Sequence, residues 1–413
     1  MTYWGEFRSH WSSLLGATLG VALGSALNHY MTNLFAPQLL REFGWARSQF
    51  ALVGTLGLVT MIFVPFAGRL ADRFGARAAA TVGFVGLPFC FFGYSLMTGP
   101  IWQFFALTVV QHIVGVLTTT LVFNRVVVER FDLARGMGLS LLMTGAPLAG
   151  AVLTPIMGEY IDSDGWRAGY RLMALISAAG GIAAVALVGR RRRPEPGPSD
   201  LASAARQNGM TRAEFGTLLR HPSFILIIAG MFFCNFPQVI VSSQLKLLLG
   251  DNGVTSSLAT WLVSLYAGGV IVGRFLSGIA LDKVSPQLVA MVALGLPAVG
   301  FIALASPLDA PWLLTGSILL IGLAQGAEGD VGAYLISRTF DMRHFSFTYS
   351  FLIASMGVAM AVGSVALSFT LRVTESFNLF LILAAALTVV GAFCFIMTGR
   401  RPPPVLEAAP SLA

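Results

Sequence analysis

The 413-residue chain is too apolar for a soluble protein: hydrophobic residues make up 56% of it and charged residues only 11%, against roughly 25% charged residues in soluble domains. Its mean hydropathy is +0.77. The net charge of +7 does not indicate nucleic-acid binding, because the cations lie at the ends of apolar segments and form no single basic face. Composition therefore predicts an integral protein of the lipid bilayer.

Twelve apolar segments follow one another along the chain, each near the length of about 20 residues that spans a bilayer as a helix. We predict spans at 11–35, 49–67, 78–97, 102–128, 137–158, 169–189, 222–248, 258–280, 287–306, 312–336, 347–370 and 377–398. The longest polar interruption follows the sixth span and is rich in arginine, proline and glycine, which is typical of a linker. The predicted domains are a six-helix bundle at 1–190, a cytoplasmic linker at 191–221 and a second six-helix bundle at 222–413.

The distribution of lysine and arginine predicts the orientation. If the N-terminus is cytoplasmic, 18 of the 26 cations fall in cytoplasmic segments, five fall on the opposite side and three lie within spans. Cytoplasmic loops of membrane proteins carry such an excess of cations. We therefore predict a multi-pass protein of the cell (inner or plasma) membrane with both termini in the cytoplasm.

A short loop signature occurs twice, with its aspartates 210 residues apart. The first copy runs from Gly68 to Arg77, and the second, weaker copy runs from Gly278 to Lys283. Repeats at half the chain length predict two similar halves, as in transporters. The aspartate can pair with helix N-terminal amides or a neighbouring helix's arginines and the glycines allow close backbone approach, so the loop can lock one state; alternatively, its arginines only set the orientation. The predicted gating residues are Gly68, Asp72, Arg73, Gly75, Arg77, Asp282 and Lys283.

Polar residues are concentrated in spans one, four, seven and ten, whereas spans three, six, nine and twelve are almost wholly apolar. Polar side chains within a bilayer belong in a bundle interior or a water-filled cavity. In span seven, Asn235, Gln238, Ser242 and Lys246 step by three and four residues, which predicts one stripe along a helix. We therefore expect four helices to line a cavity. The candidate substrate contacts on them are Asn28, His29, Gln111, Asn235 and Gln238.

With these features the whole chain resembles the major facilitator superfamily, whose loop signature the segment from Gly68 to Arg77 matches. Within that superfamily, four segments resemble the monocarboxylate transporter and oxalate–formate antiporter branch: Phe43–Ser48, Glu129–Gly136, Gly165–Arg167 and Gly273–Gly278. The resemblance implies an all-α integral membrane fold of twelve transmembrane helices in two pseudo-symmetric six-helix bundles. It also implies that the first, fourth, seventh and tenth helices line a central cavity.

Arg274 is the leading candidate for substrate contact. It lies several residues inside the cytoplasmic end of span eight, and a buried guanidinium needs a partner such as a carboxylate. Tyr266 is two turns outward on the same face, roughly 12 Å away by helical rise, and could contact the other end of a small anion. The resemblance adds that the branch places a substrate-binding arginine at this position. The alternative is a permanent salt bridge from Arg274 to Glu328 or Asp330.

Glu328 and Asp330 are the only carboxylates well inside a predicted span. Two residues apart on a helix, they point about 200° away from each other, so both cannot face one cavity. Carboxylates within a membrane commonly carry protons, which makes either a candidate for proton coupling, with Glu328 favoured because it shares the face of Gln325. The alternative is structural pairing with Arg274 and Arg338. In the branch that the chain resembles, span eight has an Asp one turn before the arginine, where this chain has Val270.

The predicted function is secondary transport of small organic anions, in the first place monocarboxylates, with or without protons. A proton-driven exporter of amphipathic or cationic compounds is the main alternative, which the acids of span ten favour and Arg274 opposes. A non-transporting membrane receptor is a weaker one. No enzyme, metal or cofactor is expected, because the five histidines lack catalytic or metal-binding spacing and the three cysteines stand singly.

Overall fold

The computed structural model describes residues 3–189, 216, 218–306, 310–340 and 345–398, and within these ranges it contains helices and no strands. Most of the predicted linker at 191–221 lies outside the described residues. Nine helical stretches in the described ranges are long and apolar enough to cross a membrane. One of them, Arg135–Val188, holds two spans, because Gly165 interrupts it with a φ of 84°. Together with Tyr3–Phe43 and Pro311–Thr339, the described chain forms the twelve predicted crossings.

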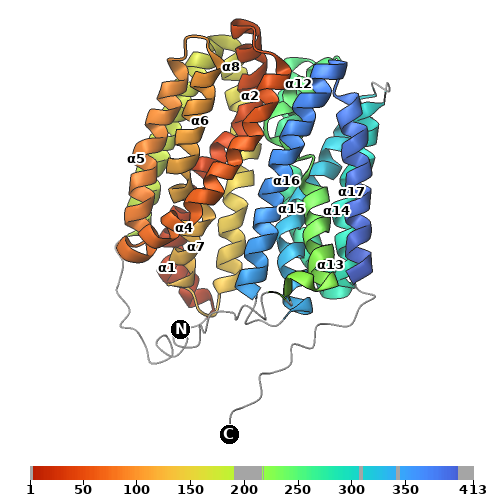
Figure 1. Cartoon of the computed structure of the whole chain (residues 1–413). Helices are drawn as coiled ribbons and strands as arrows, with labels where there is room; N and C mark the ends of the chain where they lie inside the picture. The colour runs from red at the N-terminus through yellow and green to blue at the C-terminus, as the bar shows by residue number, and fades with distance from the viewer. Residues whose placement is uncertain (1–2, 190–215, 217, 307–309, 341–344, 399–413) are drawn as a thin grey trace.

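The helices form two halves that stand side by side (Figure 1). The N-terminal half contains α1 (Tyr3–Leu23), α2 (Ser25–Phe43), α3 (Arg47–Ala51), η1 (Leu52–Leu56), α4 (Gly57–Phe74), α5 (Ala76–Ser95), α6 (Ile101–Gly115), η2 (Val116–Thr118), α7 (Thr120–Val128) and α8 (Arg135–Val188). The C-terminal half contains α11 (Pro222–Asn235), η3 (Ile240–Gln244), α12 (Leu245–Asp251), α13 (Ser256–Lys283), α14 (Pro286–Ala305), α15 (Pro311–Thr339), α16 (Phe345–Thr374) and α17 (Asn378–Thr398). We call the side where α1 begins and α17 ends the termini side, and the opposite side the far side.

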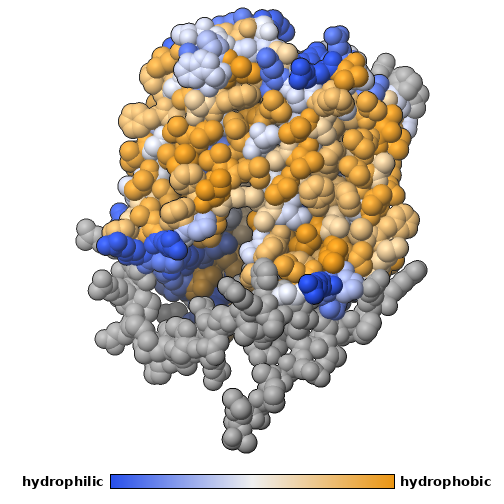
Figure 2. All heavy atoms as spheres, in the orientation of Figure 1, coloured by the Kyte–Doolittle hydropathy of each residue, from blue (hydrophilic) through white to orange (hydrophobic). Residues whose placement is uncertain are grey.

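A broad apolar belt crosses the face shown in Figure 2, with hydrophilic residues gathered above and below it. Large apolar side chains of the long helices are exposed, such as Phe89 at 73% and Ile182 at 74%. In water such exposure would be unfavourable, whereas lipid tails solvate these side chains. The distribution is that of a multi-pass membrane protein.

Three of the crossings that were expected to line a cavity are discontinuous. The first breaks at Gly24 between α1 and α2, and the fourth leaves helical geometry at Thr119, before α7. The two breaks lie together, because the backbone N–H of Ser25 donates to Thr118 Oγ1 at 2.9 Å. The seventh crossing contains a π-helix, η3. Interrupted helices free backbone groups at membrane depth, which is tolerated where they are buried in protein or line a cavity.

Helices α13 and α15 pack in direct backbone contact. Gly269 and Gly273 on α13 face Gly322 and Gly326 on α15, and a Cβ atom at Gly326 would overlap the carbonyl oxygen of Val270. Two facing Gly-x-x-x-Gly sequences allow this approach, as in other membrane helix pairs. The contact brings Arg274, which follows Gly273, against α15.

We expect Gly326→Ala to destabilise the protein by about 1–3 kcal/mol, because the added methyl group forces apart two closely packed backbones. Gly329→Ala is the matched control, since it lies one turn along the same helix and a Cβ atom there meets nothing within 4 Å. Both changes gain the same helix propensity. Thermal unfolding in detergent measures the difference, and equal midpoints for the two variants would contradict the tight contact.

Glu42 ties the end of α2 to the start of the helix that follows Gly165. Its carboxylate accepts hydrogen bonds from the side chains of Arg167 and Trp166, each at 2.5 Å. These bonds, that from Arg167 first, hold the pKa of Glu42 below its ordinary value. Glu42 lies beyond the predicted span 11–35, at the far-side rim.

This depressed pKa predicts a pH dependence of stability. A carboxyl whose pKa is lower in the folded state stabilises the fold above its unfolded pKa, and that stabilisation is lost as pH falls through the folded pKa. We therefore expect wild-type stability to fall on acidification below about pH 4 more steeply than that of Glu42→Gln. Thermal unfolding measured from pH 7 to pH 3 tests this, with the exposed Glu159→Gln as a control that should follow the wild type.

Candidate functional site

The two halves are joined by polar contacts near the far side. Asp162 lies at the far-side end of an α8 span. It forms an ion pair with Lys246, whose Nζ is 3.7 Å from Oδ1, and its Oδ2 accepts a hydrogen bond from the Ser256 hydroxyl at 2.6 Å. Arg47 forms an ion pair with Asp251. Deeper in, Asn33 donates to the carbonyl of Val241 at 2.6 Å and accepts from the Leu245 N–H at 2.8 Å. We call these eight residues the far-side seal: Asn33, Arg47, Asp162, Val241, Leu245, Lys246, Asp251 and Ser256.

A central cavity of about 340 Å³ lies on the termini side of this seal, mainly against the N-terminal half. The surface is visibly hollowed between the two halves toward the termini side (Figure 2). Most of the lining residues carry polar side chains and come from α2, α6 and the broken segment between α6 and α7, with Ser242 and Ser243 contributed by the C-terminal half. The molecule is therefore closed toward the far side and open toward the termini side.

Asn28, His29 and Gln111, all predicted as substrate contacts, line this cavity. Asn28 Nδ2 donates to Gln111 Oε1 at 3.0 Å, which links the first crossing to the fourth. His112, which is not among the predicted substrate contacts, also lines it and bonds the Thr60 hydroxyl through Nδ1 at 2.8 Å. The cavity wall thus presents amide, imidazole and hydroxyl groups.

The predicted stripe along the seventh crossing is wrong, because its members point to different places. Asn235 donates to the carbonyl of Met231 at 2.9 Å, and Gln238 lines a separate cavity of about 30 Å³ inside the C-terminal half. Ser242 lines the central cavity, and Lys246 belongs to the far-side seal. The cause is the π-helix at Ile240–Gln244, which shifts the helical phase between Gln238 and Lys246.

Arg274 is partly buried and incompletely paired. Its Nε lies 3.6 Å from Asp330 Oδ2, with 23% of the arginine side chain exposed. Both Nε and Nη1 are buried without a hydrogen-bond acceptor among the residues that the structure describes.

Tyr266 lies on the same helix as Arg274 and is fully buried. Its ring is 6.3 Å from that of Tyr30 between centroids, so it faces the N-terminal half. The Tyr266 hydroxyl has no hydrogen-bond partner within the described part of the chain. Arg274 and Tyr266 therefore both offer unused donors near the contact between the halves.

Glu328 and Asp330 lie on different sides of α15, and it is Asp330 that contacts Arg274. Glu328 is buried and lines the 30 Å³ cavity inside the C-terminal half, where its Oε2 accepts from Gln325 at 2.7 Å and its Oε1 has no described partner. Of the two carboxylates considered as partners of Arg274, Asp330 is therefore the one that lies beside it in this structure. The glycine contact sets the rotation of α15 against α13 and turns Asp330 toward the arginine. Arg338, the other cation considered, donates to the Tyr334 hydroxyl.

The first loop signature forms the expected ion pair, between Asp72 and Arg125 of α7. Gly75 separates α4 from α5 with a φ of 87°, which favours glycine. The close approach expected at Gly68 is absent here, because a Cβ atom at that position meets nothing within 4 Å. Arg73 stacks over Phe74 at 5.2 Å, and Arg77 lines a pocket beside α7.

The second copy of the signature does not repeat this pairing among the described residues. Asp282 and Lys283 are exposed at the end of α13, and neither enters an ion pair there. The two halves therefore share a fold, but the ion pair of the first signature has no counterpart among the described residues of the second.

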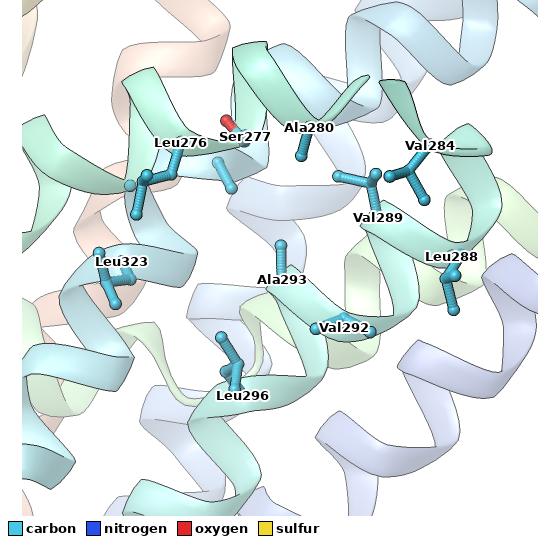
Figure 3. Close-up of a pocket in the computed structure, with 12 residues that line it drawn as sticks. Leu276, Ser277, Ala280, Val284, Leu288, Val289, Val292, Ala293, Leu296 and Leu323 are labelled. Atoms are coloured by element: carbon cyan, nitrogen blue, oxygen red, sulfur yellow. The ribbon is translucent and has the colours of Figure 1, made fainter. Parts of the chain in front are cut away.

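An apolar groove of about 310 Å³ runs between α13 and α14 (Figure 3). Leucine, valine and alanine side chains line it, and Ser277 turns its hydroxyl to the carbonyl of Arg274 at 3.0 Å. The groove offers no group that could orient a polar solute. It is therefore not a candidate substrate site.

Within the described ranges, no group of three or more His, Cys, Asp or Glu side chains could hold a metal ion. The candidate site consists of the central cavity and the Arg274–Asp330 pair. Asn33 and Asp162 were missed by the sequence analysis, because single polar residues near span ends carry no distinctive spacing. The facing glycines on α13 and α15 were also missed, although the Gly-x-x-x-Gly motif could have revealed them.

Two six-helix halves around a polar cavity, sealed on one side, define a multi-pass membrane transporter. The Major Facilitator Superfamily model matches residues 18–247 and 230–412, so the chain belongs to this superfamily. An "MFS-type transporter" of Gibberella moniliformis is 24% identical over 365 residues, which cover 87% of this chain and 82% of the relative. The "Agnestins efflux protein AgnL12" of Paecilomyces divaricatus is 24% identical over 359 residues, 83% of this chain and 75% of the relative.

A solved structure confirms the fold. The bacterial homologue of the human lysosomal transporter Spinster, in an inward-facing and occupied conformation, superimposes with a TM-score of 0.71 at 18% identity. The match covers 95% of this chain and 97% of that chain. The likeness extends over both halves.

Proposed function

We propose that this protein carries small organic anions, in the first place monocarboxylates, across the cell membrane by alternating access. The observation that carries the proposal is Arg274, a partly buried guanidinium whose Nε and Nη1 lack hydrogen-bond acceptors among the described residues. A planar guanidinium with free donors is suited to a carboxylate. The resemblance to the monocarboxylate transporter and oxalate–formate antiporter branch supports the same class.

In the proposed cycle the termini side is cytoplasmic, in keeping with the excess of cations there. The anion enters the cavity, binds Arg274 and competes with Asp330 for the guanidinium. Tyr266 and the polar wall with Asn28, His29 and Gln111 complete the contacts. The halves then rock so that the far-side seal opens and the termini side closes.

Proton coupling is assigned in this proposal to the two carboxylates of α15. Asp330 can take a proton when a substrate carboxylate replaces it at Arg274, since the released side chain would otherwise be an unpaired charge near the membrane interior. Glu328 is the second candidate, buried beside Gln325 with one oxygen free. Asp330→Asn and Glu328→Gln should each be measured for pH-driven accumulation, and full accumulation in both would remove proton coupling from α15.

Uptake into proteoliposomes against a panel of mono- and dicarboxylates, with and without a proton gradient, tests the substrate class. We expect saturable uptake of a monocarboxylate. Saturable transport of lipophilic cations with no carboxylate transport would instead establish the alternative, a proton-driven exporter of amphipathic or cationic compounds. The relative named as an efflux protein supports that second candidate.

Gating is proposed for the first loop signature. Asp72→Asn removes the charge that pairs with Arg125 of the neighbouring crossing, so it should slow or bias the conformational cycle while substrate binding stays measurable. The matched control is Asp132→Asn, an exposed aspartate that forms an ion pair with Arg135 three residues along. Exchange and uptake rates measure the effect. If Asp72→Asn and Asp132→Asn both keep wild-type rates, the loop signature only sets orientation.

A further inference from the structure

A second pocket, remote from the central cavity, opens at the termini-side rim of the N-terminal half. Its volume is about 490 Å³, and it lies between the start of α5, the end of α7 and the end of α8. Phe74, Arg77, Thr81, Glu129, Arg130 and Gly189 contribute to its lining. Ala78 and Thr81 are exposed on the outer face of α5, so the pocket borders the level where the bilayer ends.

Two cations line this pocket without a carboxylate bound to either. Arg77 and Arg130 are both half-buried, and neither forms an ion pair with a residue that the structure describes. Partial burial lowers the pKa of Arg130, while the adjacent Glu129 opposes this effect. Since arginine remains charged in proteins, the pocket holds two partly desolvated positive charges against one carboxylate.

An apolar groove of about 430 Å³ adjoins the pocket at Phe74, which lines both. The groove is formed by Phe63, Phe66 and Leu70 of α4 together with Ile113 of α6 and the following turn. Arg69 and Arg73 lie at its border. Phe66 and Phe74 are 59% and 58% exposed. A cationic pocket at the headgroup level thus continues into an apolar groove along the membrane-spanning surface.

We propose that this composite surface binds one anionic phospholipid, with the phosphate held by Arg77 and Arg130 and an acyl chain laid along Phe63 and Phe66. Basic pockets between transmembrane helices commonly bind lipid headgroups. Arginine binds phosphate oxygens through two parallel hydrogen bonds. Glu129 disfavours a second negative charge, so the site suits a singly charged headgroup such as phosphatidylglycerol.

Lipid binding to the purified full-length chain, measured by native mass spectrometry and by thermal shift, tests the proposal. The probes are phosphatidylglycerol, phosphatidylcholine of the same chain length, and inorganic phosphate. We expect phosphatidylglycerol to bind at least tenfold more tightly than phosphatidylcholine, because it carries the net charge that the arginines require. Equal binding of both lipids would overturn the proposal. Full competition by inorganic phosphate at lipid-equivalent concentration would also overturn it and show a free-anion site.

The double variant Arg77→Gln/Arg130→Gln should weaken phosphatidylglycerol binding at least tenfold. The matched control is Lys283→Gln/Arg338→Gln, which removes the same charge from the same side of the C-terminal half and should leave this binding unchanged. Phe66→Ser tests the groove separately: it should weaken the long-chain lipid and leave a six-carbon-chain analogue unaffected. Equal loss in both double variants would reduce the effect to general surface charge and contradict the site.

Discussion

Arg274→Ala should abolish high-affinity binding of the carboxylate substrate. Losing a charge-assisted hydrogen bond costs about 1.5–3 kcal/mol, which corresponds to about a ten- to a hundred-fold loss of affinity. Arg274→Lys should show a smaller loss, because it keeps the charge and loses the planar fork. Equilibrium binding of the best substrate from the uptake panel measures both, with thermal unfolding to show that each variant is folded.

The partner of Arg274 sharpens this test. If Asp330 competes with substrate for the guanidinium, Asp330→Asn should bind the anion at least as tightly as the wild type. A merely structural ion pair would instead lose stability, and substrate binding with it, in both variants. Arg338→Ala serves as a control, since that arginine contacts Tyr334 on the same side of the molecule. A wild-type dissociation constant in folded Arg274→Ala would return the residue to a structural role.

Asp162→Asn should shift the molecule toward the state that is open on the far side. Asp162 holds two residues of the opposite half, and one of them, Lys246, is only 4% exposed. Without the carboxylate, Lys246 is a buried charge with no counter-ion in the closed state. Separation of the halves would expose it to water, which favours the open state. Because Asp162 is itself 38% exposed and the pair is 3.7 Å apart, we discount the effect to about 1–2 kcal/mol. That corresponds to a change of roughly 5- to 30-fold in the ratio of the two states.

Distances between spin labels at the exposed positions Thr98 and Glu375, one on each half, measure this ratio. Asp164→Asn is the control: it lies two residues along, is exposed, and accepts a hydrogen bond from the adjacent Ser163 and from no other residue that the structure describes. An unchanged distance distribution in Asp162→Asn would mean that the apolar contacts between the halves, and not this cluster, keep the far side closed.

The architecture could be predicted from the sequence because lipid imposes simple rules. Apolar length identified the crossings, and the polarity of spans one and four placed Asn28, His29 and Gln111 in the cavity, where the structure has them. Side-chain directions within span seven could not be predicted. A regular period of 3.6 residues assigns Gln238 and Lys246 to one face, whereas the π-helix between them separates these residues.

The acidic partner of Arg274 likewise could not be predicted from the sequence. Rotation of α15 about its axis decides between Glu328 and Asp330, and that rotation is set by contacts between helices distant in the chain. Gly273 and Gly326 fix this rotation, because they let the two backbones approach so closely that a Cβ atom at either position would clash. The roles assigned to all of these residues stay predictions until the variants above are measured.

The backbone contact between α13 and α15 has a mechanical consequence. Two helices that touch through glycines cannot slide or separate without opening a void. We therefore expect α13 and α15 to move as one rigid body through the proposed transport cycle. Arg274 lies on α13 and Asp330 on α15, so the distance between their Cα atoms should be the same in every state. Any exchange of partners at the guanidinium must come from rotation of side chains about their own bonds. In the proposed cycle, the part that moves relative to these two helices is the opposite wall, which includes Tyr30 of the N-terminal half.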